Sequence, residues 1–324
     1  IINIGKEESP EIDLLSPKRS IGILRNYYNE NIGLKKTCVD LYVALKTNYL
    51  SDDPFPDKVI RGKDDMYFLG DNYNELFKDA FGNTSISITT LNGISNTLIK
   101  TKKYLKQRNI DFYIVIAPNK HSIYKENLPF ELQPKETRLD RLKNHLVSNT
   151  DIEIIDLRDV LIKNKQAPLY LRTDTHWNEY GAFIGYEKVI EVMNSSRAIP
   201  QRQLSEYLMS TSIFKNGDIT KMINLEVQDE QIQLAPKFKP QKEILEVAQT
   251  NYHTKNTSKT LKLLMYHDSF ADAWMNFFDE TFGEVVYLKG ATVNEQDIEE
   301  ETPDIVLIEL VERNLGQLEK KAPK

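Results

Sequence analysis

Cysteine is almost absent from this sequence, and apolar runs long enough to cross a membrane are absent from it. Cys38 is the only cysteine among the 324 residues, which excludes an internal disulfide and a zinc cluster built from cysteines. No signal peptide is visible. Because the chain starts with Ile1 and not with methionine, we expect that the natural N-terminus has been removed, and a signal or an anchor with it.

Charge of one sign does not dominate the chain either. Acidic and basic residues are interspersed and sum to −6 at pH 7, so the sequence offers no basic surface for nucleic acid. A composition of 40% hydrophobic and 28% charged residues is typical of a soluble globular protein of one large or two modest domains. This composition is compatible with the cytoplasm and with a cysteine-poor bacterial exterior, so it leaves localisation open.

Residues 1–57 are predicted to form an N-terminal helical extension, with a helix from Ser16 to about Leu50. Two short apolar runs on either side of residues 61–65 predict a hairpin. Residues 89–108 carry leucine and isoleucine on one helical face and predict a second helix.

Residues 58–324 are predicted to form one α/β domain. Apolar runs alternate with helical patterns there, which is typical of a mostly parallel sheet with helices on both faces. The predicted strands are 112–117, 152–155, 261–266, 285–288 and 304–310. The predicted helices lie at 139–146, near Val160, at 182–193 and at 271–278.

Residues 196–258 interrupt this alternation. They are polar, contain three prolines and show no long periodicity. We therefore expect an insertion over the sheet, with short strands near Ile232 and Leu234.

The stretch 172–178 (RTDTHWN) places a carboxylate, an imidazole and an indole on a predicted strand-to-helix turn. A carboxylate two residues before a histidine can orient an imidazole that acts on a third group. The alternative is that Asp174 only caps the following helix and that His176 is a satisfied polar residue. A metal bound by both side chains is a rival interpretation, but two ligands with no third nearby make a poor zinc site.

A second turn, residues 267–270 (HDSF), ends a predicted strand and opens a helix. Free N–H groups at a helix N-terminus favour a developing anion, so Ser269 is placed as a nucleophile would be. The alternative is that Asp268 or Ser269 is only an N-cap.

Together the two turns supply the parts of a catalytic triad. Ser269 would be the nucleophile, His176 the general base and Asp174 the acid that orients the base. These residues, like Gly290 and Arg313, follow predicted strands, and open parallel sheets bind ligands beyond the carboxyl ends of their strands.

These stretches resemble the SGNH-hydrolase-like domain of the bacterial polysaccharide O-acetyltransferases. This family includes the alginate O-acetyltransferases AlgX and AlgJ and Gram-positive relatives that acetylate cell-wall polysaccharides. Residues 174–178 (DTHWN) and 268–270 (DSF) carry the resemblance, which spans about 58–315. Three further segments agree with the family's G-K-D-G-W-L-F, P-x-K…Y…L-P and P-D-x-V…E-R segments, namely 62–69, 117–129 and 303–313.

The motif order differs from that of ordinary SGNH enzymes. Those enzymes place the serine first and a D-x-x-H last, whereas here the D-x-H comes first, as in the rearranged acetyltransferase branch. His267 stands where the G-D-S block has its glycine. His267 could compete as the base, although its position before the turn favours a packing or supporting role.

The resemblance implies the roles of nucleophile, base and orienting acid given above, and no cofactor or metal. It also implies an oxyanion hole formed by the Ser269 N–H and by the residues at the positions of Gly290 and Arg313. The alternative for Arg313 is an ion pair with Glu309 or Glu312.

Other residues near the motifs have two interpretations each. Trp177 is expected to pack under the helix and shape the pocket, or to stack on a sugar ring. Tyr124 and Lys120 are expected to line the substrate path, or to be exposed polar residues on a loop. The other histidines show no ligand spacing and are expected to face solvent: His121, His145 and His253.

The resemblance implies O-acetyl transfer through a Ser-linked intermediate onto hydroxyls of a bacterial cell-wall or exopolysaccharide. It further implies a membrane-bound O-acyltransferase partner that delivers the acetyl group, and an extracytoplasmic location. Two rivals remain from the residues: a carbohydrate acetylesterase with the same triad, and a non-catalytic polysaccharide-binding module.

Overall fold

A computed structural model describes residues 42, 43, 46, 55–129, 131, 135–215, 217–247 and 251–323. The predicted helix from Ser16 to about Leu50 lies outside the described residues, apart from three positions, and so does most of the proposed extension 1–57. Cys38 also lies outside them.

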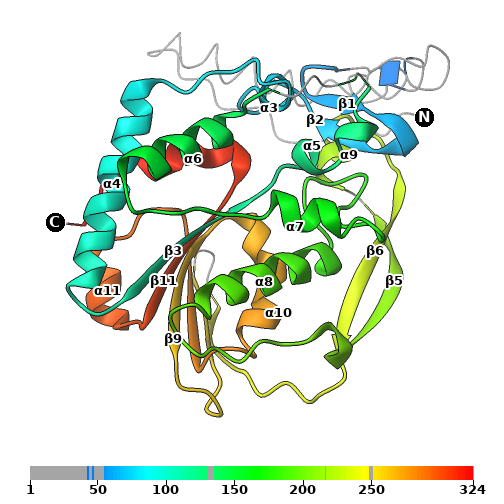
Figure 1. Ribbon diagram of the computed structural model, residues 1–324. Coiled ribbons are helices and arrows are strands. Elements are labelled where there is room, and N and C mark those ends of the chain that lie inside the picture. Colours follow the sequence, from blue (N-terminus) through cyan, green and yellow to red (C-terminus); the bar gives the residue numbers. More distant parts are fainter. Residues whose placement is uncertain are drawn as a thin grey trace, which may run out of the picture.

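A seven-stranded sheet in the order β4-β3-β11-β9-β10-β8-β7 forms the centre of the molecule (Figure 1). The first five strands run parallel to one another, and β8 and β7 add an antiparallel edge. The predicted class, a mostly parallel α/β sheet, is therefore confirmed. The bounds are β3 Asp111–Ala117, β4 Ile155–Asp156, β7 Glu243–Val247, β8 Asn251–Lys255, β9 Lys262–His267, β10 Glu284–Lys289 and β11 Ile305–Val311.

Helices cover both faces of the sheet because its strands are apolar on both sides. In β9, Leu263 and Met265 face one core while Leu264 and Tyr266 face the other. The helices of the first core are α7 Arg158–Lys163, α8 Glu179–Met193, the 3₁₀-helix η5 Ser269–Trp274 and α10 Met275–Phe278. Those of the second are α4 Ile88–Lys106, α6 Arg138–Asn149, α11 Glu295–Glu301 and the 3₁₀-helix η6 Glu312–Glu319.

The helix after the D-x-H turn begins where the sequence places it. The side chain of Asn178 accepts a hydrogen bond from the Gly181 N–H and caps α8. Asn178, and not Asp174, is thus the N-cap, which leaves Asp174 available to other partners.

The insertion contributes more than the predicted coil with two short strands. The region near Ile232 and Leu234 is a nine-residue strand, β6 Gln228–Pro236, paired with β5 Tyr207–Lys215 as an antiparallel ribbon. Its end supplies β7 and β8 to the main sheet, which corrects the expectation of an insertion lying only over the sheet. Neither edge strand was predicted, because all five residues of β7 are exposed and lack apolar alternation.

The predicted hairpin is present as β1 Val59–Arg61 and β2 Tyr67–Leu69. It forms a small separate core with helix α3 Leu76–Ala80 and with α9 Asp218–Lys221 of the insertion. The remaining short elements are η2 Lys63–Asp65, α5 Lys120–Ile123, η3 Lys125–Asn127 and η4 Leu204–Glu206. Across the described ranges, no helix combines the length and the apolar character that a membrane span needs.

Candidate active site

The candidate active site lies at the carboxyl ends of the parallel strands. β9 ends at His267 and leads into the turn that carries Ser269, while β3 and β11 end beside Asn119 and Arg313. This edge is where the crossover geometry of parallel sheets collects side chains from distant parts of a chain.

The structure brings Asp174, His176 and Ser269 into one hydrogen-bonded chain. Nε2 of His176 lies 2.8 Å from Oγ of Ser269, and Nδ1 lies 2.7 Å from Oδ1 of Asp174. The backbone N–H of His176 also donates to that Asp174 oxygen, at 3.0 Å. Ser269 is exposed and the His176 side chain is 30% exposed, so both can be reached from solvent.

Asp174 is held in the ionised form. Burial raises its pKa, but hydrogen bonds from the His176 ring, the Asp218 N–H and the His176 N–H outweigh burial and lower the pKa to about 2. A carboxylate that stays charged at neutral pH keeps the proton of the imidazole on Nδ1 and leaves Nε2 free to accept one.

The turn that carries Ser269 is fixed by Asp268. One carboxylate oxygen of Asp268 accepts the Phe270 N–H, which makes Asp268 the N-cap of η5. The other accepts the Val311 N–H of β11, at 2.8 Å. Since Asp268 takes the capping role, the hydroxyl of Ser269 remains available to His176.

Lys120 and Tyr124 do not occupy the loop positions expected of them. Both are buried, with 3% and 8% exposure. The ammonium of Lys120 donates to three backbone oxygens around the D-x-H turn, those of Leu171, Arg172 and Asp174. The expectation of exposed polar residues is wrong because these side chains support the turn from beneath.

Burial lowers the pKa of Lys120 to about 7, against the opposing pull of nearby carboxylates. Its three oxygen acceptors match the three N–H groups of the charged form. Tyr124 makes a different contact, in which its hydroxyl accepts the Leu169 N–H at 2.9 Å.

Two carboxylates of the insertion reach the same turn, and neither was predicted from the sequence. Asp218 accepts from the Thr175 N–H and hydroxyl, at 2.7 and 2.6 Å, and its own N–H donates to Asp174 at 2.9 Å. Asp229 accepts from the Thr173 N–H at 3.0 Å. Neither residue lies in a motif, so no local signal in the sequence points to them.

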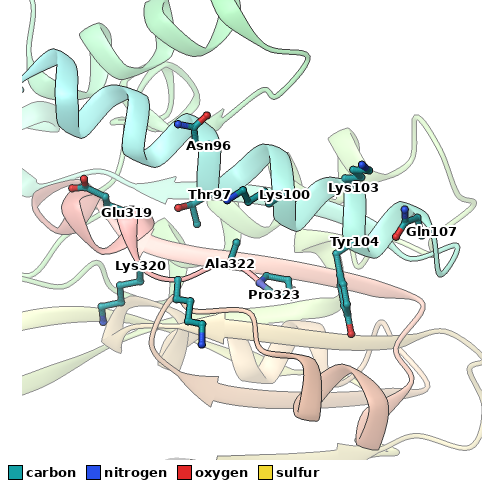
Figure 2. Close-up of a pocket in the computed structure, with 11 residues that line it drawn as sticks. Asn96, Thr97, Lys100, Lys103, Tyr104, Gln107, Glu319, Lys320, Ala322 and Pro323 are labelled. Atoms are coloured by element: carbon teal, nitrogen blue, oxygen red, sulfur yellow. The ribbon is translucent and has the colours of Figure 1, made fainter.

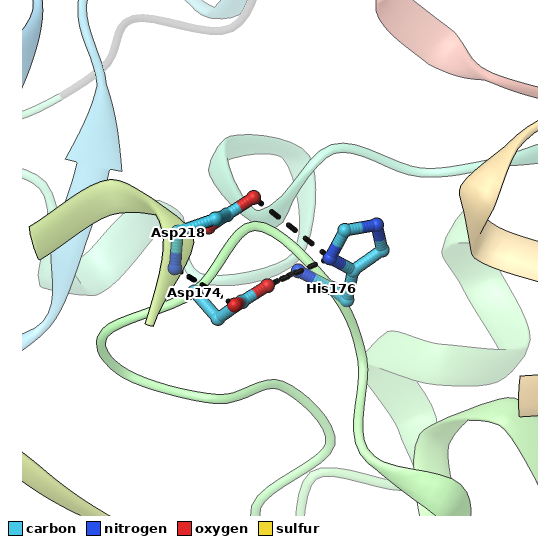
Figure 3. Close-up of side chains that lie close together, drawn as sticks. All are labelled: Asp174, His176 and Asp218. Atoms are coloured by element: carbon cyan, nitrogen blue, oxygen red, sulfur yellow. Dashed lines mark hydrogen bonds and ion pairs between the residues drawn. The ribbon is translucent and has the colours of Figure 1, made fainter. Parts of the chain in front are cut away.

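Asp174, His176 and Asp218 each present one ligand atom within 4.8 Å of the others (Figure 3). The expectation that no third ligand lies near Asp174 and His176 is therefore wrong. All three are already engaged with one another or with Thr175. A metal on Nδ1 of His176 would have to displace the Asp174 hydrogen bond, so the donor set fits a hydrogen-bonded network better than a metal centre.

Arg313 makes no ion pair with Glu309 or Glu312 among the residues that the structure describes. Its Nη1 donates to Oδ1 of Asn119 at 3.2 Å, and its guanidinium carbon lies 5.4 Å from the centre of the Phe270 ring. Burial lowers the pKa of Arg313, although a guanidinium stays charged at neutral pH.

The two glutamates have other partners. Glu309 accepts the Asp268 N–H, and Glu312 accepts the Asn119 N–H. Arg313 thus lies beside Phe270, which follows Ser269, and donates to Asn119, to which no site role was assigned from the sequence.

Gly290 follows β10 with a φ of +118°. Its N–H donates to the carbonyl oxygen of His267 at 2.9 Å, so this group is not a free donor for an oxyanion. The N–H of Ser269, the first residue of η5, belongs to the first turn of a helix, whose N–H groups have no acceptor within the helix.

Trp177 packs beneath the loop that carries His176. It is 3% exposed, its indole N–H donates to the Phe270 carbonyl at 2.9 Å, and its ring contacts Trp274 and Phe270. A side chain buried this way cannot stack on a sugar.

His267 is also packed in the interior. It is 1% exposed, its Nδ1 lies 2.7 Å from the Asp268 carbonyl oxygen, and burial lowers its pKa. His121 is buried as well, which corrects the expectation that it faces solvent: its Nε2 lies 2.9 Å from the Leu69 oxygen, and burial lowers its pKa to about 3. His145 and His253 are partly exposed.

Cavities near and far from the triad differ in size. A cavity of about 10 Å³ lies beside the triad, lined by residues that include Asn119, Lys120, Thr175 and Arg313. A cavity of about 630 Å³ lies instead between α4 and the C-terminal segment, with Lys100, Tyr104 and Pro323 in its lining and no member of the triad (Figure 2). The exposure of Ser269 and His176 shows that the triad is open to solvent.

A mostly parallel sheet with a serine, a histidine and a carboxylate hydrogen-bonded at its carboxyl edge has the architecture of the SGNH-hydrolase-like class. Residues 59–277 match the family described as "SGNH hydrolase-like domain, acetyltransferase AlgX". Since the match covers more than half of the chain, the protein belongs to this family.

The individual proteins to which the chain is similar share less than a third of its residues. The chain is 28% identical over 159 residues to a probable alginate O-acetylase AlgJ of Azotobacter vinelandii, a match that covers 48% of this chain and only 38% of that protein. Among solved structures it is similar to Bacillus cereus PatB1, with a TM-score of 0.62, 16% identity, and coverage of 82% of this chain and 99% of that one. The O-acetyltransferase domain of Pseudomonas putida AlgJ gives a TM-score of 0.54 at 16% identity, over 80% of this chain and 92% of that one.

Proposed function

We propose that this protein is an O-acetyltransferase that moves an acetyl group through Ser269 onto the hydroxyls of a bacterial cell-wall or exopolysaccharide. The observation that carries the proposal is the hydrogen-bonded chain of Asp174, His176 and Ser269 at the carboxyl edge of the sheet. Membership of the AlgX family and the similarity to a probable alginate O-acetylase support an acetyl group and a polysaccharide acceptor.

The first half-reaction acylates the serine. Oγ of Ser269 attacks the carbonyl carbon of the acetyl donor while Nε2 of His176 takes the hydroxyl proton. The negative oxygen of the tetrahedral intermediate faces the Ser269 N–H and the guanidinium of Arg313. The donor's leaving group then departs with the proton from His176.

The second half-reaction transfers the acetyl group. A sugar hydroxyl attacks the acetyl-Ser269 ester, His176 takes the proton of that hydroxyl, and the proton returns to Oγ as the ester bond to serine breaks. The exposure of Ser269 and His176 suits an acceptor that is a polymer, because a chain of sugars can approach an open site without being enclosed.

The donor and the location follow from the family resemblance. We propose that a membrane-bound O-acyltransferase partner supplies the acetyl group and that the protein works outside the cytoplasm. An exposed triad also admits water, so a carbohydrate acetylesterase is the competing function.

The test is to supply an activated acetyl ester with and without candidate oligosaccharides and to measure acetylated sugar against free acetate. Transfer predicts acetylated sugar, less free acetate as the acceptor concentration rises, and an acetyl adduct on Ser269 in the intact mass. The matched control is Ser269→Ala, which should form none of these products. Fast acetate release that ignores every glycan would identify an esterase. Absence of any adduct or product would leave a binding module.

A further inference from the structure

The Nδ1 side of the His176 ring, away from Ser269, lies next to two carboxylates. Nδ1 lies 2.7 Å from Oδ1 of Asp174 and 3.9 Å from Oδ2 of Asp218 (Figure 3). The hydroxyl of Thr175 stands between the ring and the second acid: it donates to Asp218 at 2.6 Å and lies 3.3 Å from Nδ1. A triad accounts for Asp174 only, so Asp218 is a second acid beside His176 that the proposed mechanism does not use. Burial and the neighbouring Asp174 raise the pKa of Asp218, against hydrogen bonds from Thr175 that lower it.

We propose that Asp218 is a second positioning acid for His176, whose negative charge stabilises the imidazolium formed when the base takes the proton of Ser269. The inference rests on the proposed function, since it assigns Asp218 a part in the same acyl transfer.

Asp218 is built into this position by its own backbone. Its N–H donates to Oδ2 of Asp174, the oxygen that does not face the imidazole, so Asp218 also orients the first acid. The preceding Gly217 lies so close to Thr173 that a Cβ at Gly217 would come within 2.2 Å of the Thr173 carbonyl oxygen. Ile219 of α9 is buried in the small core with β1 and β2, and this packing holds α9 in place.

Other charged groups of both signs surround this cluster. They come from the elements packed against the loop: Lys120 of α5, Arg172 of the loop itself, Asp229 of β6, Asp268 of the serine turn and Arg313 after β11. None of these five forms an ion pair with the His176 ring, whose ion-pair partners among the described residues are Asp174 and Asp218. Removing the charge of Asp218 therefore leaves the imidazolium with one counter-charge in place of two.

The charge can be removed with little change in shape by Asp218→Asn. This variant keeps the backbone N–H to Asp174 and a side-chain oxygen for the Thr175 N–H. The matched control is Asp229→Asn, which neutralises the other insertion carboxylate that holds the same turn but has no contact with the imidazole.

The probe is labelling of Ser269 by phenylmethanesulfonyl fluoride, followed by intact mass from about pH 5 to 9. In this reaction the Oγ–S bond forms, the S–F bond breaks, the serine proton passes to His176 and fluoride leaves. Labelling needs a neutral imidazole, and a nearby negative charge favours the protonated one. Asp218→Asn should therefore move the acid limb of the rate profile to lower pH and slow labelling on the plateau by roughly five- to tenfold. Asp229→Asn should leave the limb where it is.

Each other outcome has one meaning. An unchanged limb in a folded Asp218→Asn protein, with or without a slower plateau, overturns the electrostatic role. If Asp218→Asn fails to fold by circular dichroism, Asp218→Ser decides, because it also removes the charge and keeps a side-chain oxygen near the Thr175 N–H. It should shift the limb in the same direction, and no shift overturns the inference. Failure of the wild-type protein to label at Ser269 overturns the proposed function and this inference with it.

Discussion

The imidazole of His176 is bound at both of its nitrogens, and that fixes which nitrogen carries the proton. Asp174 holds the proton on Nδ1, so Nε2 points its lone pair at the hydroxyl of Ser269. The same pair of bonds makes the three side chains act as a unit. Losing one member should remove nearly everything that the other two contribute.

Ser269→Ala and His176→Ala should each lower the rate of acetyl-ester turnover by roughly 10³-fold or more, and the double variant should be little worse than either. The measurement is kcat/KM with an activated acetyl ester for the wild type, both single variants and the double variant. Multiplying losses in the double variant would show that the two residues act independently.

Arg313 differs from the triad because its contacts are with Asn119 and Phe270 and not with the base. Arg313→Lys keeps the charge but loses the planar fork of donors. We expect turnover to fall by about 10²-fold, as for the loss of one oxyanion donor, with a nearly unchanged melting temperature. A lower melting temperature with unchanged turnover would assign Arg313 to the stability of the fold.

At the scale of elements, the loop between α7 and α8 is ordered by parts of the chain far from it in sequence. Lys120 of α5 binds three of its carbonyl oxygens, Asp218 and Asp229 bind its N–H groups, and the Tyr67 N–H of the hairpin donates to the Arg172 oxygen. The motif itself could be predicted because its residues are consecutive. The role of the supporting residues could not be predicted, because they lie in separate segments that meet only in the folded chain.

Lys120→Met should therefore destabilise the fold by about 2–4 kcal/mol, since it leaves buried carbonyl oxygens without a donor. The loss should depend on pH. Burial lowers the pKa of Lys120 in the folded protein to about 7 from its ordinary value of 10.5, so between these pH values the unfolded chain holds more protons at this site. The stabilising contribution of Lys120 is then smallest below about pH 7 and grows as pH rises through this window.

The check is to compare chemical unfolding of wild type and Lys120→Met at about pH 7 and pH 9, because groups common to both proteins cancel in the difference. The gap in stability should be wider at the higher pH. An equal gap at both values would mean that Lys120 has the same charge in the folded and unfolded states.

At the scale of the whole molecule, the fold class and the parallel core strands could be predicted because buried strands are apolar along their whole length. β3, β9 and β11 lie where their apolar runs indicate. The edge was not predictable in this way. The residues of β7 are exposed, and those of β8 are exposed or partly exposed apart from the polar Thr254, so pairing with neighbours is what makes them strands. Hydrophobic patterns in a sequence reflect side-chain burial, so a strand that is held mainly by backbone pairing has no clear hydrophobic pattern.

The loop that carries His176 precedes both insertion carboxylates that hold it, Asp218 and Asp229, by some forty residues or more. During synthesis His176 is therefore made before these two supports, and the loop lacks their hydrogen bonds until the insertion has docked. Damage to the insertion should act on the same loop. We expect a protease cut between α8 and β6 to release the loop that carries His176 while the buried sheet stays folded. Hydrogen exchange in residues 172–176 should then rise well before exchange in β9 or β11, and the protein would lose its chemistry without losing its fold.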